Sequence, residues 1–284
     1  MQKLVLDRKG PVIIVDGSYF IFHRFFATLK WYRFRNPSID DSSCMANEEF
    51  CSAIQKHAIA DLQKLRKKWA SVSAGKQRLS RKDWESIPIW FAMDCHRASI
   101  WRSELVCDYK GTRDIGRAAF DPSCFEVLYE RISKDVPLLR VGSLEADDVV
   151  ALTHKRLREI GYDGLIVCVT NDNDYLQLLD KNTQLYNLDG KDIGKRSCGD
   201  PKKDLMLKVL LGDKSDNIAP VRTKLSEKKL RDMLDLDEEG IVAALCLNDE
   251  EKARMETNRK LVDFSCIPAA LVEAYNSMHD IELM

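Results

Sequence analysis

The sequence predicts an α/β fold: a mostly parallel central sheet with helices on both faces, followed by a C-terminal helical region. Three apolar runs, at 11–15, 87–93 and 164–170, have the length and composition of buried strands. Helical patterns lie between them, and this alternation is typical of a parallel sheet covered on both faces. From about residue 217 onward the strand pattern is absent, and only short helical stretches follow.

The helices are expected from the residues at which they begin. After the first strand, Gly17 and Ser18 suit a tight turn and a helix start. A long helix is predicted over 47–70, with Asn47 as its cap. Its buried stripe is expected to consist of Phe50, Ile54, Ala58, Leu62 and Leu65. Further helices are predicted from 121, over 145–160, from about 173 and from 200 to about 212, with a short strand at 138–141.

The composition is that of a globular protein with one large domain, or one domain and an appendage: 284 residues, 45% hydrophobic and 31% charged. No apolar run reaches the length of a membrane span, and the first residues lack a signal-peptide pattern. The nine cysteines form no C-x-x-C pair and are expected to be reduced thiols. We therefore expect a cytoplasmic protein without membrane association.

Acidic residues form five short clusters, and three of the clusters directly follow predicted strands. The clustered acids are Asp16, Asp94, Glu145, Asp147, Asp148, Asp172, Asp174, Asp213 and Asp216. Because the carboxyl ends of parallel strands meet at one edge of a sheet, we expect these acids to converge. Each cluster alone would be explained as turn residues or helix caps. Together, they cannot all stay ionised without counter-charge, and Mg²⁺ prefers oxygen ligands. The pattern therefore predicts a metal site that handles phosphate.

The distribution of charge favours a polyanionic partner, although the formal net charge is −1. Outside the clusters, 36 acids remain against 44 lysines and arginines. A basic surface around an acidic, metal-holding cleft suits nucleic acid.

The segment Tyr109-Lys110-Gly111-Thr112-Arg113-Asp114, which is flanked by arginines, supplies further candidates. Lys110 and Arg113 could face a phosphate, and Tyr109 could stack on an unpaired base. The flanking candidates for substrate contact are Arg97, Arg102 and Arg117. The alternative is a solvated basic face with one buried tyrosine.

Six motifs in order resemble the 5′-nuclease superfamily, which includes flap endonucleases and the 5′-exonuclease domains of bacterial DNA polymerases. They are Val15-Asp-Gly-Ser18, the strand into Asp94, Asp108-Tyr-Lys-Gly-Thr-Arg-Asp114, Glu145-Ala-Asp-Asp148, Thr170-Asn-Asp-Asn-Asp174 and Gly212-Asp-Lys-Ser-Asp-Asn-Ile218. They span residues 12–218. Within this superfamily, the chain resembles the ribonuclease H and flap nuclease of tailed phages.

The resemblance implies a PIN-like nuclease domain over 1–212, with a short arch region at 97–135, and a C-terminal helical DNA-binding subdomain over 213–284. It implies two Mg²⁺ ions, for which Mn²⁺ would substitute. Asp16, Asp94, Glu145 and Asp147, with Asp148 beside them, would hold one ion. Asp172, Asp174, Asp213 and Asp216 would hold the other.

Lys110 and Arg113 would act in catalysis, and Lys224 could touch the duplex. Family members often continue into a glycine-rich, potassium-binding clamp, but 219–226 has no glycine pair, so its presence stays open.

The implied activity is 5′-3′ exonuclease and 5′-flap endonuclease cleavage of DNA and RNA–DNA hybrids, in the removal of RNA primers or flaps during replication. The implied partners are branched or flap DNA, RNA–DNA hybrids, a single-stranded-DNA-binding protein and replication proteins. A monomer is expected, in the host cytoplasm if a phage encodes the chain. Two alternatives remain: a PIN-type single-strand ribonuclease, and a non-catalytic, structure-specific DNA-binding protein.

Overall fold

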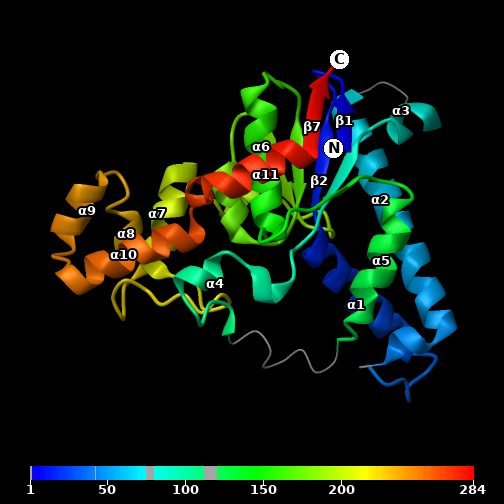
Figure 1. Ribbon diagram of the computed structural model, residues 1–284, viewed down its shortest axis with the longest axis horizontal. Helices are drawn as coiled ribbons and strands as arrows, with labels where there is room; N and C mark the ends of the chain where they lie inside the picture. Colours follow the sequence, from blue (N-terminus) through cyan, green and yellow to red (C-terminus); the bar gives the residue numbers. More distant parts are fainter. Residues whose placement is uncertain (1, 42, 75–79, 112–119) are drawn as a thin grey trace.

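The central sheet of the protein is parallel throughout, as predicted. The computed structural model describes residues 2–41, 43–74, 80–111 and 120–284. Figure 1 shows a central sheet with helices on both sides and a lobe of helices beside it. The sheet has the order β4-β3-β2-β5-β6, and every neighbouring pair is parallel. Its strands are β2 (Val12–Asp16), β3 (Ile89–Ala92), β4 (Leu138–Leu139), β5 (Ile166–Val169) and β6 (Thr183–Tyr186).

One face of the sheet is covered by three helices with the short α3 (Arg81–Glu85) near its edge (Figure 1). The three are α1 (Gly17–Arg33), α2 (Glu48–Ala74) and α5 (Ser123–Ser133). The side chain of Asn47 accepts a hydrogen bond from the Phe50 amide at 3.0 Å, as expected of the helix cap. All five members of the predicted α2 stripe are buried in the core on this face. The periodicity of this helix therefore predicted its packing correctly.

The other face is covered by α6 (Ala146–Glu159) and α11 (Ala269–Met278). Their apolar residues share a core with β1 (Gln2–Leu6) and β7 (His279–Leu283). These two strands, the first and last elements of the chain, form a separate parallel pair. The helix expected from about 173 is a 3₁₀ helix, η4 (Asn173–Leu178), packed beside α6. The segment after β5 is therefore helical, as expected, but it is a short 3₁₀ helix.

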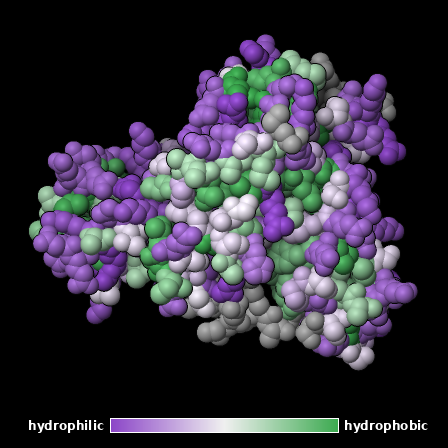
Figure 2. Space-filling view, viewed as in Figure 1, coloured by the Kyte–Doolittle hydropathy of each residue, from purple (hydrophilic) through white to green (hydrophobic). Residues whose placement is uncertain are grey.

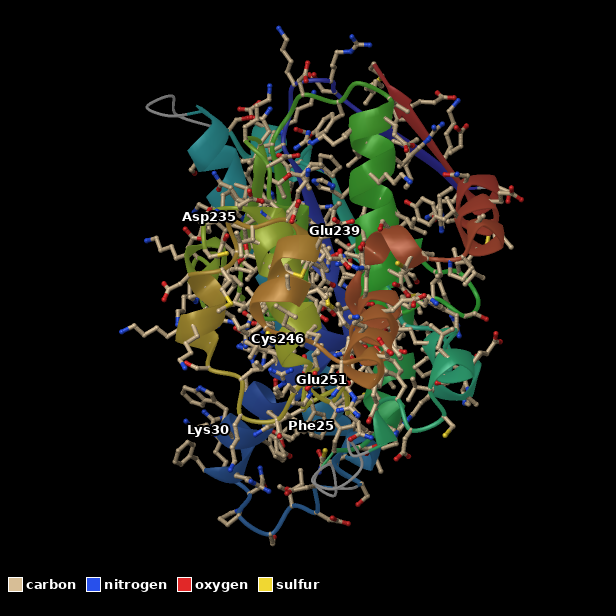
Figure 3. All side chains as sticks on the ribbon, turned by 90° about the vertical axis from the view of Figure 1, so that its left-hand side faces the viewer. Phe25, Lys30, Asp235, Glu239, Cys246 and Glu251 are labelled. Atoms are coloured by element: carbon tan, nitrogen blue, oxygen red, sulfur yellow. The ribbon has the colours of Figure 1, made fainter. Side chains whose placement is uncertain are left out.

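A lobe of helices lies to one side of the sheet (Figure 1) and has an apolar core of its own. It contains α7 (Pro201–Leu211), α8 (Glu227–Arg231), α9 (Glu238–Ala244) and α10 (Asp249–Val262), with α4 (Arg102–Leu105) against α10. Figure 2 shows that mainly hydrophilic residues cover the visible face of this lobe. Figure 3 looks onto the lobe, with Asp235, Glu239, Cys246 and Glu251 marking α8 to α10.

The end of the chain returns to the α/β body, which the sequence analysis did not predict. No strand was expected after 217, yet β7 pairs with β1 along five residues. Strands β1 and β6 were also missed. The assignment of 213–284 to a DNA-binding subdomain stays a prediction, but α11 and β7 pack with the α/β body rather than with the helical lobe. Within the described residues, no helix is both long and apolar enough to cross a membrane.

Candidate metal centre

Asp16 and Asp94 lie at the carboxyl edge of the sheet because the strands that precede them, β2 and β3, are neighbours. Asp16 ends β2 and is in register with Ala92, the last residue of β3, two residues before Asp94. The Asp16 carboxylate caps α1 by accepting from the Tyr19 amide at 3.0 Å. Asp94 accepts from the Ala146 amide at 2.6 Å, which ties β3 to the start of α6. The pairing of β2 with β3 therefore brings Asp16 and Asp94, which are 78 positions apart in sequence, to one edge of the sheet.

A pocket of about 950 Å³ lies at this edge and collects acids from five segments of the chain. Its lining includes Asp16, Asp94, Glu145, Asp147, Asp172 and Asp213. Two groups of acids could each hold a metal ion, because their oxygens lie within 4.8 Å of one another. We call Glu145, Asp147 and Asp148 the first acid group, and Asp174, Asp213 and Asp216 the second. The predicted convergence of the acidic clusters is present.

Two lysine side chains neutralise part of this charge. The Lys110 ammonium pairs with Glu145 of the first acid group and lies 3.7 Å from Asp216 of the second. The Lys208 ammonium pairs with Asp174 and Asp213. Lys208 was missed by the sequence analysis. Its place in the last turn of the helix before Asp213 was the available signal, because that turn points toward the acidic loop.

Burial perturbs the acids of the pocket. Loss of solvent, with the charge of Asp94 beside it, raises the pKa of Asp16 to about 7. Burial and Asp147 raise the pKa of Glu145 to about 7, against the opposing effect of Lys110. Burial and Asp172 raise the pKa of Asp174 to about 8. These acids are costly to ionise where they lie, so a cation bound among them would be stabilised by every ionised carboxylate.

Asp148 has a different environment from the other acids. It is fully buried, and its two oxygens accept hydrogen bonds from the Arg102 guanidinium at 2.6 and 2.8 Å. The same carboxylate accepts from the Trp101 indole at 3.0 Å and from the Glu145 amide at 3.2 Å. Its role as a direct metal ligand stays a prediction. The hydrogen bonds favour an indirect role, because donors already surround both oxygens.

Two of the predicted substrate contacts are buried in the structure, and their role in substrate binding stays a prediction. Arg102 was expected to contact substrate, but its side chain is 1% exposed and bonds to Asp148 and Glu145. Tyr109 was expected to stack on a base, but it is 7% exposed. Its hydroxyl donates to Glu145 at 3.0 Å and lies 3.4 Å from Asp216. Both side chains are drawn inward because the buried acids need donors.

The remaining candidates are placed as follows. Arg97 is exposed, lines the pocket and donates to the Lys110 carbonyl at 3.0 Å. Lys224 is exposed in the loop before α8. Arg113 and Arg117 lie outside the described residues.

The fold and the acidic pocket define a class of nuclease. Residues 11–203, more than half of the chain, match the family described as 5′-3′ exonuclease, N-terminal resolvase-like domain. The chain belongs to this family of 5′-nucleases, which are hydrolases acting on phosphodiester bonds.

Similar proteins agree with this assignment. Ribonuclease H of Enterobacteria phage T4 is 27% identical over 216 residues, covering 66% of this chain and 70% of that protein. DNA polymerase I of Streptococcus pneumoniae R6 is 26% identical over 245 residues. The match covers 78% of this chain but 23% of the polymerase, so the chain spans less than a quarter of that relative.

Solved structures share the fold. The bacteriophage T5 D15 protein co-crystallised with metal ions has a TM-score of 0.62 and 18% identity, with 94% of this chain and 97% of that chain covered. A variant of the T5 D15 flap endonuclease, solved as a pseudo-enzyme–product complex with DNA and metal ions, has a TM-score of 0.61 and 15% identity over 94% and 97% of the two chains.

Proposed function

We propose that the chain is a divalent-metal-dependent 5′-3′ exonuclease and 5′-flap endonuclease acting on DNA and RNA–DNA hybrids. The observation that supports this most strongly is the meeting of two acid groups at one pocket, which is lined by Glu145 and Asp147 of the first group and Asp213 of the second. Each group is paired with a lysine. Membership of the 5′-nuclease family supports the reaction class. Two Mg²⁺ ions, replaceable by Mn²⁺, are part of the proposal.

The donor set fits such ions because hard divalent cations take carboxylate oxygens. Asp16, Asp94, Glu145 and Asp147 would hold one ion, directly or through water. Asp172, Asp174, Asp213 and Asp216 would hold the other. When bound, the ions supply an activated water and stabilise charge on the attacking and leaving oxygens of the phosphate.

The protein's own residues would position the substrate phosphate and neutralise part of its charge. The Lys110 ammonium reaches both acid groups and lines the pocket, so it is placed to offset charge on a phosphate held between them. Arg113 would assist it, and Arg97 and Arg117 would contact the strand beside the scissile bond. Tyr109 would act by orienting Glu145 rather than by stacking.

The substrate would be recognised by shape through phosphate contacts. Residues 213–284 would contribute to duplex binding beside the nuclease domain at 1–212, with Lys224 as one contact. We propose a role in removing RNA primers or flaps during replication. A single-stranded-DNA-binding protein and replication proteins would be the partners of a monomer acting in the cytoplasm.

The test is cleavage of labelled 5′-flap DNA, an RNA–DNA hybrid and single-stranded RNA, in Mg²⁺ and in EDTA. We expect flap and hybrid cleavage in Mg²⁺ only. Asp94→Asn and Asp147→Asn should each lower the single-turnover rate by at least about 10³-fold, because each removes a charge that the metal site needs. Asp163→Asn, an exposed acid before β5, is the matched control and should cleave normally.

Other outcomes separate the alternatives. Cleavage of single-stranded RNA alone would indicate a PIN-type ribonuclease. Binding of flap DNA without cleavage in Mg²⁺ or Mn²⁺ would indicate a non-catalytic DNA-binding protein.

A further inference from the structure

Arg102 joins three parts of the molecule that are far apart in sequence. It begins α4, which packs against α10. Its guanidinium donates to Asp148 and to Glu145 Oε2 (3.0 Å) at the start of α6. Its Nε donates to the carbonyl of Leu261, in the last turn of α10, at 2.6 Å. One buried side chain therefore contacts both the first acid group and the end of a helix in the lobe.

The contact at α10 satisfies a general need of helices. The last carbonyls of a helix have no partner within it, and a positive charge near them is favourable. Arg102 donates to the Leu261 carbonyl, and the side-chain amide of Gln177 donates to the Val262 carbonyl at 3.0 Å. The position of this helix end is thus coupled to Arg102.

The contact at Glu145 fixes a candidate metal ligand. Glu145 Oε2 receives Arg102 and the Tyr109 hydroxyl, each at 3.0 Å, while Lys110 pairs with Oε1. The Arg102 guanidinium itself lies 4.6 Å from the centre of the Trp101 ring, whose indole nitrogen also donates to Asp148. Because the guanidinium is planar and held on several sides, it has little freedom to let Glu145 move.

We propose that Arg102 is a positioning residue. It holds Glu145 in place in the first acid group and couples metal binding there to the position of the last turn of α10. This rests on the proposed function, because it takes the first acid group to bind a divalent cation. Partners of a metal ligand typically change metal affinity by 10–100-fold when they are removed. By linkage, a metal ion that orders Glu145 also stabilises the end of α10.

A purely structural arginine is available for comparison. Arg158 pairs with Asp180 and donates to the carbonyls of Tyr162, Gly164 and Asn182. It is a multiply bonded arginine like Arg102. It lies at the amino end of β5, away from the acid groups. Arg158→Lys therefore reports the cost of losing an arginine network without touching the pocket.

The first experiment is Mg²⁺ titration by calorimetry, without DNA, on the wild type, Arg102→Lys and Arg158→Lys. We expect the dissociation constant for Mg²⁺ to rise about tenfold or more in Arg102→Lys. In Arg158→Lys it should change by less than about twofold, even if the melting temperature falls. Equal Mg²⁺ affinity in the wild type and Arg102→Lys would overturn the proposal. A wild type that binds no divalent cation would instead overturn the proposed metal site, and the present inference with it.

The second experiment needs no variant, so it decides even if Arg102→Lys fails to fold. Hydrogen exchange of the wild type is followed with and without Mg²⁺. No member of either acid group lies on α10, so a metal site that is not coupled to this helix, through Arg102 or through Gln177 beside the second acid group, would leave its last turn unchanged relative to α9. We expect Mg²⁺ to slow exchange in the last turn of α10 by at least about threefold more than in α9. No such difference would overturn the coupling.

Discussion

Replacement of Lys208 by methionine is expected to lower the free energy of unfolding by about 3 kcal/mol at pH 7.5 in EDTA. The side chain is 18% exposed, and its carboxylate partners Asp174 and Asp213 are 9% and 18% exposed. Methionine keeps most of the aliphatic stem, so the change mainly removes the charge. The two acids are then left without their cation in a poorly solvated site.

The magnitude follows from these surroundings. Breaking a buried pair by removing one partner costs about 3–5 kcal/mol. Here the cost falls at the lower end, because Asp174, whose pKa is about 8 even with Lys208 beside it, is only partly ionised at pH 7.5. Saturating Mg²⁺ should recover part of the loss, since a bound cation replaces the missing charge. The variant should also bind Mg²⁺ more tightly, because no ammonium competes for the same oxygens.

The assay is urea unfolding followed by circular dichroism, in EDTA and in Mg²⁺. Lys203→Met is the matched control on the same helix, because Lys203 pairs with Asp235, which is 83% exposed. Its cost should stay below about 1 kcal/mol in both conditions. An equally small cost for Lys208→Met in EDTA, or a loss that grows in Mg²⁺, would refute the electrostatic reasoning.

Two further predictions concern pH and packing. The pKa values of Asp16 and Glu145, about 7, and of Asp174, about 8, lie above the ordinary values near 4. Raised values favour the protonated acids in the folded state, so this stabilisation is complete below about pH 4 and is lost as the pH rises through 7 and 8. Unfolding free energies in EDTA should therefore fall between about pH 5 and 8, and saturating Mg²⁺ should flatten the decline; a rise in EDTA over this range would contradict the assignment. Gly17→Ala should destabilise by at least about 2 kcal/mol, because the new Cβ would lie 2.2 Å from the Ala92 carbonyl oxygen. Unfolding at the wild-type urea midpoint would show that β2 and β3 can separate without cost.

The parallel sheet and its acidic edge were predictable because both rest on local patterns. Strands buried on both faces have uninterrupted apolar runs, and an acid directly after such a run must lie at the edge where the strand ends. The stripe of α2 was predictable for a similar reason, since helical periodicity alone decides which side chains face the core. The strands β1 and β7 were missed because each mixes polar with apolar residues and is only partly buried, and they pair only with each other across the length of the chain.

The sequence by itself determined which residues could carry the chemistry: the acids at the strand ends, and Lys110 beside a tyrosine. Only the tertiary structure decided their partners. It turned Arg102 and Tyr109 inward, because Asp148, Glu145 and Asp216 are buried and need donors. It placed Lys208 between two acids from different segments. Strand ends follow from contacts along the chain, whereas the partner of a buried charge depends on which distant segments fold against it.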